Sequence, residues 1–497
     1  MSTVTAHAQN LIGDHWLDGS GEEFQRITPA GDATVCSGFA ASLSQVDDAI
    51  SAARKAFFPW SETSLDARMN IARRFAELVS ERKEELARLI STEMGKPLWE
   101  SRTEAMAVVG KVGNSIDAIM KRRWTTSEQL GDYVAVTRYR PHGVMLVLGP
   151  FNLPAHLPGS HMVPALLAGN TIVFKPSELA PTVGQWLVET WQAAGIPTGV
   201  INLVHGGAPV AIHAAESRQV DGVLFTGSHK VGLSLHRSMA GQPHRVLVLE
   251  LGGNNPLVVH QCQDLRRTAF TIINSAYLTS GQRCTCARRL IVVGQSNYDS
   301  LMHLLARMLP KVRVSDPFAE PQPFMGPLVH ATAAQNMLSA QAEMLAAGAE
   351  PIVEMKLSGT HPALLSPGLI AVSSQFSNDS EHFGPLLVAQ VASDLDEAIQ
   401  LASATQFGLS AGFLGDRIED FHYFLHRVRA GIVNWNRQTT GASGRLPFGG
   451  VGASGNHQPS GYFAADYCSY PIGSLESHGI SDSEQSTPGL DQIVEPE

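Results

Sequence analysis

Five short apolar segments, each followed by Gly or polar residues and then by a helical stretch, constrain the fold of this chain more than any other feature. The segments are VMLVL (144–148), TIVF (171–174), VINLV (200–204), VLF (223–225) and RVLVL (245–249). Continuous apolar strands that alternate with helices are typical of a parallel sheet covered on both faces. We therefore expect an α/β fold with a doubly wound, Rossmann-like domain that binds ligands beyond the carboxyl ends of its strands.

The same pattern starts again after residue 253 and continues to about residue 452, which predicts a second α/β domain. Upstream of the first run, apolar residues recur at helical spacing in three stretches: 47–56, 66–90 and 101–119. Residues 121–140 alternate apolar and polar side chains, so they are expected to be extended. Residues 476–497 carry acidic residues but no Lys or Arg, and we expect a disordered acidic tail there.

Composition and charge narrow the class of protein. The chain has 497 residues and a formal net charge of −10, which fits a large enzyme and argues against a nucleic-acid partner. Its five scattered cysteines do not form a disulfide framework and favour a reducing compartment. We see no secretory signal and no apolar run long enough to cross a bilayer, so a cytoplasmic protein without a membrane partner is expected.

Cys284 is a candidate nucleophile in the turn GQRCTC (281–286), which follows a helical stretch. A thiol reacts as its thiolate, and the neighbouring Arg283 could lower the pKa of Cys284. On these six residues alone, a buried structural cysteine is the stronger interpretation. A zinc site is disfavoured because Cys284 and Cys286 have no second Cys or His pair at metal spacing, and no metal is expected.

Glu250 and Asn152 are candidate partners of such a nucleophile. Glu250 follows the strand at 245–249, where a carboxylate beside glycines could act as a general base. A salt-bridged or helix-terminal Glu explains the position equally well. Asn152, in GPFNLP (149–154), offers an amide N–H to a developing oxyanion, although a turn Asn between prolines is the simpler explanation.

Two further turns could hold a nucleotide. FTGSHKVG (225–232) runs from a strand through a turn into a helix, so backbone N–H groups near Ser228 could bind a phosphate. The segment lacks the complete G-x-G-x-x-G fingerprint. In KPSE (175–178), Glu178 could accept hydrogen bonds from a ribose diol.

Taken together in order, these motifs resemble the aldehyde dehydrogenase superfamily. The matching segments are GPFNLP (149–154), KPSE (175–178), FTGSHKVG (225–232), ELGG (250–253), GQRC (281–284), EHFGP (381–385) and PFGG (447–450). The resemblance extends from about residue 10 to residue 473. So many motifs in one order make it highly specific.

The resemblance implies a role for each matching position. Cys284 would be the nucleophile, Glu250 the base that activates the hydrolytic water, and Asn152 the oxyanion hole together with the Cys284 N–H. NAD is the implied cofactor, with these contacts: Lys175 and Glu178 at the adenine ribose, Ser228 with Gly227 and Gly232 at the pyrophosphate, Glu381 at the nicotinamide ribose, and Phe383 beside the ring. Phe151 stands where Trp or Tyr is usual, and His382 occupies a variable position; neither change removes a catalytic group.

The patterns and the resemblance together give domain limits. An NAD-binding domain is expected at 1–120 and 142–251, a catalytic domain at 252–455, and oligomerisation segments at 121–141 and 456–475. A homodimer or homotetramer is implied. NAD is expected over NADP because the Glu178 carboxylate would repel a 2′-phosphate.

Segments 149–175, 281–290 and 431–443 resemble a branch of the superfamily that oxidises N-succinyl-L-glutamate 5-semialdehyde to N-succinyl-L-glutamate in arginine catabolism. This small-molecule aldehyde carries two carboxylates remote from the reacting carbon, so cations are expected in its pocket. The candidates are Arg437, Arg283 and Arg445, with His156 as a weaker one.

Three alternatives remain open at this stage. The chain could act on another semialdehyde. It could be a CoA-acylating relative, which Glu250 disfavours because such relatives generally lack it. It could also be a non-catalytic binding protein, which the joint presence of Cys284, Glu250 and Asn152 disfavours.

Overall fold

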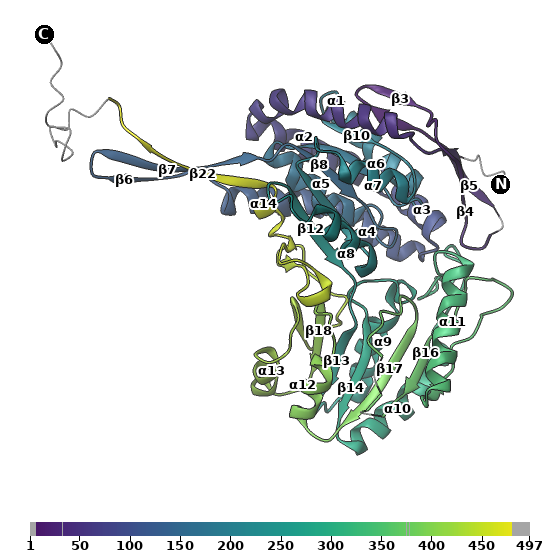
Figure 1. Ribbon diagram of the computed structural model, residues 1–497. Coiled ribbons are helices and arrows are strands. Elements are labelled where there is room, and N and C mark those ends of the chain that lie inside the picture. The colour runs from purple at the N-terminus through teal and green to yellow at the C-terminus, as the bar shows by residue number, and fades with distance from the viewer. Residues whose placement is uncertain (1–5, 32, 374, 377, 480–497) are drawn as a thin grey trace, which may run out of the picture.

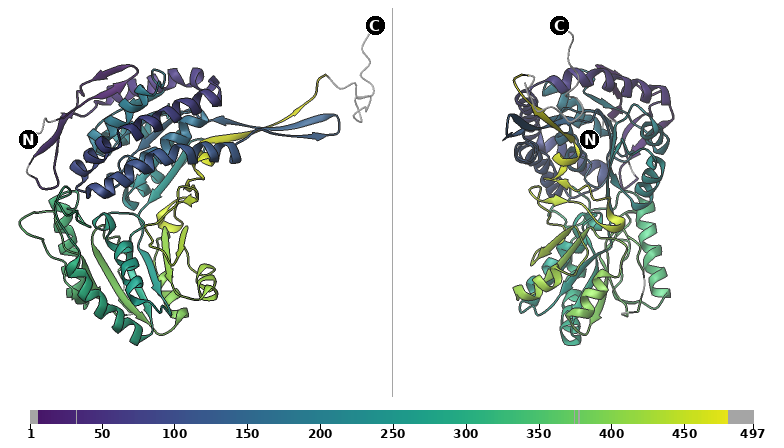
Figure 2. Two further views of the ribbon diagram at one scale, coloured as in Figure 1. Left: turned by 180° about the vertical axis from the view of Figure 1, so that it is seen from behind. Right: turned by 60° about the vertical axis from the view of Figure 1, so that its left-hand side comes forward.

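The structure is a computed structural model that describes residues 6–31, 33–373, 375–376 and 378–479. Two α/β domains lie one above the other, and a thin three-stranded sheet projects from their side (Figure 1). Figure 2 shows the same arrangement from behind and from a second side. This is the predicted fold class: two doubly wound domains and a small additional sheet.

The first domain is built on a seven-stranded sheet with the order β12-β11-β8-β9-β10-β2-β3. Strands from β12 to β10 pair in parallel, whereas β2 and β3 are antiparallel additions at one edge. The strands are β2 (Asn10–Ile12), β3 (His15–Leu17), β8 (Val144–Leu148), β9 (Thr171–Lys175), β10 (Ile201–Leu203), β11 (Gly222–Gly227) and β12 (Val246–Leu251).

Helices cover both faces of this sheet, which explains why its strands are apolar throughout. Val144 and Leu146 of β8 pack on one face, and Met145 and Val147 pack on the other, as strand alternation requires. The covering helices are α1 (Leu43–Glu62), α7 (Ala208–Glu216) and α8 (His229–Met239) on the first face, and α2 (Leu65–Glu81), α3 (Lys83–Met94), α4 (Leu98–Arg122), α5 (His156–Ala168) and α6 (Pro181–Ala193) on the second.

The second domain repeats this design with the strand order β15-β16-β17-β14-β13-β18-β19. Only β15 pairs in the antiparallel direction among these seven described strands. The strands are β13 (Asn255–Val259), β14 (Ala287–Val293), β15 (Glu350–Val353), β16 (Gly368–Ala371), β17 (Leu386–Ala392), β18 (Ser410–Leu414) and β19 (Ile432–Trp435). The helices are α9 (Leu265–Tyr277), α10 (Gln295–Met308), α11 (Ala331–Ala346), α12 (Leu395–Ser403) and α13 (Ile418–Leu425).

The projecting sheet joins distant parts of the chain. Its central strand β7 (Tyr133–Pro141) pairs with β6 (Thr126–Leu130) on one side and with β22 (Ser469–Glu476) on the other. The short helix α14 (Ala464–Tyr467) leads into β22. Leu130, Tyr133 and Leu475 are exposed apolar residues of this sheet.

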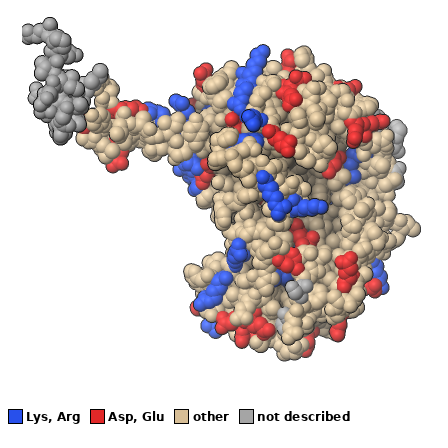
Figure 3. All heavy atoms as spheres, in the orientation of Figure 1, with Lys and Arg blue, Asp and Glu red and all other residues tan. Residues whose placement is uncertain are grey.

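Short elements complete the chain. The remaining ones are the sheet β1 (Ala6–Ala8), β4 (Glu23–Ile27) and β5 (Thr34–Phe39), the pair β20 (Pro447–Phe448) and β21 (Ser460–Gly461), and the 3₁₀ turns η1 (Leu278–Gly281), η2 (Leu309–Lys311) and η3 (Gly452–Ser454). Among the described residues, no helix is long and apolar enough to span a bilayer. Acidic and basic side chains are interspersed over the face in Figure 3, without a large region of one sign.

The structure corrects the sequence prediction in three places. The helical pattern at 66–90 is two helices, α2 and α3, which meet at Arg82. Lys121 and Arg122 were expected to be extended, but they form the last turn of α4, where basic side chains interact favourably with the helix dipole. Glu476 of the expected acidic tail belongs to β22, and residues 480–497 lie outside the described part of the chain.

Candidate active site

The turn that carries Cys284 lies between the two domains and is held at several points. The Asn255 side-chain amide donates to the carbonyls of Cys284 at 2.7 Å and Cys286 at 2.8 Å. Gly281 has φ +74, and a Cβ there would lie 2.1 Å from the Gly384 carbonyl oxygen. Arg288 donates to the Gly281 carbonyl at 2.7 Å. Only glycine therefore fits at 281, and the turn has little freedom to move.

Cys284 lines a cavity of about 330 Å³, whereas Cys286 is buried with its thiol against the Leu278 carbonyl. The volume suits a small organic substrate. Polar, charged and apolar residues together line the cavity: Thr103, Glu104, Ala107, Lys111, Leu153, His156, Leu157, Ser160, Leu278, Arg283, Thr285, Gln438, Thr440, Ala442, Ser443, Gly444, Phe448, Ser460 and Gly461.

The environment of Cys284 does not favour the thiolate in this structure. Burial raises the pKa of Cys284 to about 12, and the negative charges of Glu250 and Glu381 act in the same direction. Arg283 lowers this pKa, as its proximity suggested, but its effect is smaller. The expected direction of the Arg283 effect is therefore confirmed, but burial and the acidic neighbours outweigh it, and the net shift of the Cys284 pKa is upward. The Arg283 guanidinium itself pairs with Glu100, at 2.6 Å.

Glu250 lies near the carboxyl end of β12 and is 3% exposed. Its Oε2 accepts a long hydrogen bond from the Thr226 hydroxyl at 3.4 Å, and its Oε1 has no hydrogen-bond partner among the described residues. Burial raises the pKa of Glu250 to about 7, whereas the nearby Ser460 and the charge of Lys111 act to lower it. A carboxyl group with this pKa can accept or release a proton at neutral pH.

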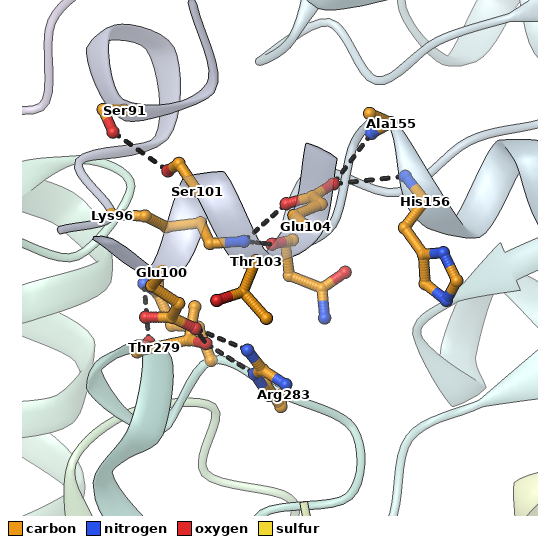
Figure 4. A network of polar contacts seen from close by, with 12 residues as sticks. Ser91, Lys96, Glu100, Ser101, Thr103, Glu104, Ala155, His156, Thr279 and Arg283 are labelled. Atoms are coloured by element: carbon orange, nitrogen blue, oxygen red, sulfur yellow. Dashed lines mark hydrogen bonds and ion pairs between the residues drawn. The ribbon is translucent and has the colours of Figure 1, made fainter. Parts of the chain in front are cut away.

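The loop of Asn152 is tied to α4 by buried charges (Figure 4). Lys96 forms an ion pair with Glu104 at 2.5 Å and donates to the Asn152 carbonyl at 3.3 Å. Glu104 in turn accepts the N–H groups of Ala155 at 2.9 Å and His156 at 3.2 Å. The backbone on both sides of residue 153, which lines the cavity, is thus fixed by α4.

The same helix also holds the Cys284 turn. Glu100 accepts hydrogen bonds from Arg283 and from the Thr279 hydroxyl, and Arg283 donates to the Thr279 hydroxyl at 2.7 Å. Lys96 lies just before α4, whereas Glu100 and Glu104 lie near its N-terminus, and Figure 4 shows the contacts of both acidic side chains. Asn152 and Cys284, which are 132 residues apart, are consequently positioned by one turn and a half of one helix.

The nucleotide-site candidates of the first domain lie beyond the carboxyl ends of its strands. Lys175 ends β9 and is buried, donating to the carbonyls of Pro176 at 2.7 Å and Gly206 at 2.8 Å. Glu178 is 62% exposed and lies 3.8 Å from the Lys175 ammonium. Glu178, Gly206 and Gly207 line a second cavity of about 90 Å³ at this edge.

The candidate phosphate-binding segment, residues 225–232, runs from β11 through a turn at Ser228 into the N-terminus of α8. Ser228 caps α8 by accepting the Val231 N–H, and Gly227 is the last residue of β11. A Cβ on Gly232 would lie 2.4 Å from the Leu251 side chain, so glycine allows α8 to pack closely on β12. The free N–H groups at the start of α8 are suited to an anion.

Glu381 and Phe383 come from the second domain, and they contact the segments that carry Glu250 and Asn152. The Gly253 N–H donates to Glu381 at 3.2 Å, and a Cβ on Gly252 would overlap the Glu381 carboxylate. The Phe383 ring meets Phe151 edge-on, with ring centroids 5.9 Å apart. The structure therefore brings the segments of Glu381, Glu250 and Asn152 together.

The structure separates the candidate substrate residues into two groups. Arg283 and His156 line the cavity, whereas Arg437 and Arg445 are exposed and are absent from its described lining. Arg437 follows β19, on a turn that puts its side chain in solvent, and Arg445 lies in the exposed loop before β20. The structure thus does not bring these two arginines into the described lining of the cavity.

Sequence reasoning missed Lys111 and Ser460. Both line the cavity, and both act on the pKa of Glu250. Lys111 could have been noticed, because it is a charge between Val108 and Val112 on a helix whose other inward positions are mostly apolar. Ser460 belongs to a two-residue strand and gives no comparable signal.

Comparison with known proteins decides the family. A sequence model described as "Aldehyde dehydrogenase family" matches residues 16–471. The chain belongs to the aldehyde dehydrogenase family.

Similar proteins include curated relatives and solved structures of this family. Two proteins named N-succinylglutamate 5-semialdehyde dehydrogenase are each 48% identical to this chain. The one from Chromohalobacter salexigens aligns over 98% of this chain and 100% of its own length. The one from Burkholderia ambifaria aligns over 97% of this chain and 99% of its own length. An NAD-dependent aldehyde dehydrogenase from Sinorhizobium meliloti is 30% identical over 97% of both chains, with a TM-score of 0.92. An aldehyde dehydrogenase from Bacillus cereus in complex with NAD⁺ has a TM-score of 0.90 at 26% identity, over 95% of this chain and 97% of that one.

The ion pair of Lys96 gives a testable prediction for this aldehyde dehydrogenase. We expect Lys96→Met to lower the free energy of unfolding by about 3–5 kcal/mol, because it leaves the buried Glu104 carboxylate without its cation. Urea titration followed by fluorescence measures the change. Lys121→Met, at an exposed ion pair of α4, the helix that carries Glu104, should change it by less than about 1 kcal/mol. The double variant Lys96→Met/Glu104→Gln should recover part of the loss; no recovery would contradict the ion-pair explanation.

Proposed function

We propose that this chain oxidises N-succinyl-L-glutamate 5-semialdehyde to N-succinyl-L-glutamate with NAD, through a thioester on Cys284, as a step of arginine catabolism. The observation that carries the proposal is the cavity in which Cys284 opens among polar and cationic side chains, next to the buried carboxyl group of Glu250. The two named relatives at 48% identity, aligned over nearly their whole length, support the choice of substrate.

The first step requires a nucleophile and a stabilised alkoxide. The Cys284 sulfur attacks the aldehyde carbon, a C–S bond forms, and the carbonyl oxygen takes the negative charge. Asn152 and the Cys284 N–H would donate hydrogen bonds to this oxygen. Because the pKa of Cys284 is raised to about 12, the thiol must lose its proton in or just before this step; the Glu250 carboxylate would accept this proton and release it to solvent before the second step.

The second step releases the acid. Glu250 would take a proton from a water molecule, whose oxygen attacks the thioester carbon while the C–S bond breaks and the sulfur leaves as thiolate. The pKa of about 7 makes Glu250 a base of suitable strength near neutrality. Hydrolysis at this carboxylate is also the reason to prefer a free-acid product over an acyl-CoA product.

The residues along the first domain's strand ends fit a dinucleotide. When bound, NAD supplies the acceptor for the hydride that leaves the substrate carbon. Lys175 and Glu178 would hold the adenine ribose. The pyrophosphate would bind at the N-terminus of α8, near Gly227, Ser228 and Gly232. Glu381 would hold the nicotinamide ribose, and Phe383 would lie beside the nicotinamide ring. The fit rests on the cavity beside Glu178, the tight packing at Gly232 and the open turn of Ser228. NAD is preferred because the exposed Glu178 carboxylate would repel a 2′-phosphate.

We also propose an assembly and a compartment. Residues 121–141 and 456–475 would join copies of the chain in a homodimer or homotetramer, since a projecting sheet with exposed Leu130 and Leu475 gains apolar burial from a partner. Residues 1–120 with 142–251 and residues 252–455 would be the NAD-binding and catalytic domains. The five free cysteines fit a reducing compartment, the cytoplasm.

A substrate screen tests the proposed activity. Purified protein is assayed for NADH formation with N-succinylglutamate, glutamate and succinate semialdehydes, with NAD or NADP, and with or without CoA. We expect the highest kcat/KM for the succinylated substrate with NAD, and free N-succinylglutamate as the product even when CoA is present. A higher kcat/KM for either of the other two semialdehydes, or an acyl-CoA product, would overturn the assignment.

Replacement of Glu250 should separate the two chemical steps. With Glu250→Gln we expect one rapid burst of NADH per active site and then a steady-state rate about 100- to 10,000-fold below that of the wild type, because the thioester is no longer hydrolysed efficiently. Rapid mixing with absorbance detection measures the burst. Cys284→Ser should abolish both phases, whereas a steady-state rate near that of the wild type in either variant would refute the roles.

The activity should depend on pH through Glu250. The base works when it is deprotonated, so kcat should fall as the pH decreases through about 7; the raised pKa of Cys284 affects the first step in the same direction. The profile is measured between pH 5.5 and 8.5 at saturating substrate and NAD, with NAD binding followed separately at each pH. A kcat that is constant over this range would contradict the role of Glu250.

A further inference from the structure

Lys111 is a buried cation in the wall of the Cys284 cavity. It lies in α4, is 2% exposed, and lines the same cavity as Cys284. Its ammonium group donates to the Gly461 carbonyl at 2.8 Å. An ammonium group has three donors, so this contact leaves two for another partner.

The other charged groups of the cavity wall already have partners. Arg283 pairs with Glu100 at 2.6 Å, and Glu104 pairs with Lys96 at 2.5 Å. Lys111, in contrast, has no carboxylate within ion-pair distance among the described residues. A buried ammonium without a counter-ion is costly in free energy, and an anionic ligand would remove this cost.

Lys111 keeps its charge near neutral pH, whereas His156 does not supply one. Burial lowers the pKa of Lys111 to about 8, against the charge of Glu250, so the protonated form still predominates at pH 7. Burial lowers the pKa of His156 to about 3, so that ring is neutral. Together with the exposure of Arg437 and Arg445, this leaves Lys111 as the cation of the described cavity wall that is free to meet a ligand.

We propose that Lys111 binds a carboxylate of the aldehyde substrate and thereby selects acidic semialdehydes over neutral aldehydes. The proposal rests on the proposed function, in which the substrate carries two carboxylates away from its aldehyde. The ammonium group and the carboxylate would form a charge-assisted hydrogen bond inside a cavity with little water, where such contacts are strong. The Gly461 carbonyl orients the ammonium group through its contact with Lys111.

A second role for Lys111 makes a different prediction. Its charge lowers the pKa of Glu250, so it could act only as a counter-ion of the base. Such a role would change the rate with every aldehyde and shift the pH profile of kcat. Binding of a substrate carboxylate changes KM for acidic aldehydes alone.

The experiment compares an acidic with a neutral aldehyde in three proteins. The substrates are N-succinylglutamate semialdehyde and hexanal; the proteins are the wild type, Lys111→Met and the control Lys121→Met, which makes the same change at an exposed position of α4. For Lys111→Met we expect KM to rise about 10- to 100-fold for the acidic aldehyde and less than 3-fold for hexanal. Lys121→Met should leave both values unchanged.

The outcomes separate this proposal from the proposed function. An equal effect of Lys111→Met on both aldehydes, or a shifted kcat profile with unchanged KM, would overturn the role of Lys111. If the wild type prefers another acidic semialdehyde, the proposed substrate is wrong, but the same comparison with that aldehyde still tests Lys111. If Lys111→Met does not fold, Lys111→Gln and Lys111→Arg replace it. We expect Lys111→Gln to lose the preference for the acidic aldehyde and Lys111→Arg to retain part of this preference. An unchanged preference in Lys111→Gln would refute the proposal.

Discussion

The buried ion pairs of α4 are the constraint on which the rest of the site depends. Lys96 with Glu104 fixes the loop after β8, and Glu100 with Arg283 fixes the turn before β14. Buried charges of this kind need accurate geometry, because an unpaired member costs several kcal/mol. One rigid helix therefore sets the distance between two loops that belong to different domains, and small movements of the domains are resisted where the chemistry occurs.

Desolvation determines the protonation of the acidic groups at the cavity. Burial raises the pKa of both Cys284 and Glu250, and each negative charge there disfavours the other. As a result, Cys284 and Glu250 do not both carry a negative charge at neutral pH. The buried ammonium of Lys111 is the opposing charge, and it lies in the wall close enough to lower the pKa of Glu250.

Much of the fold could be predicted from the sequence because its signals are local. The strands β8, β9 and β12 begin and end within two residues of their apolar runs, since glycines and prolines mark their ends. The three-residue strands β1, β2 and β3 were not predicted, because so few residues show no periodicity. Lys121 and Arg122 were assigned to a strand because their charges hid the end of α4.

The sequence by itself determined the family, the order of the motifs, and the identity of Cys284, Glu250 and Asn152 as candidates, because these depend on residues close together in the chain. Only the tertiary structure decided which cations reach the cavity and which way each pKa shifts. Arg283 neighbours Cys284 in sequence but turns to Glu100, whereas Lys111 lies 173 residues from Cys284 in the chain and lines its cavity. Burial and charge pairing arise from contacts between distant segments, so local patterns do not contain them.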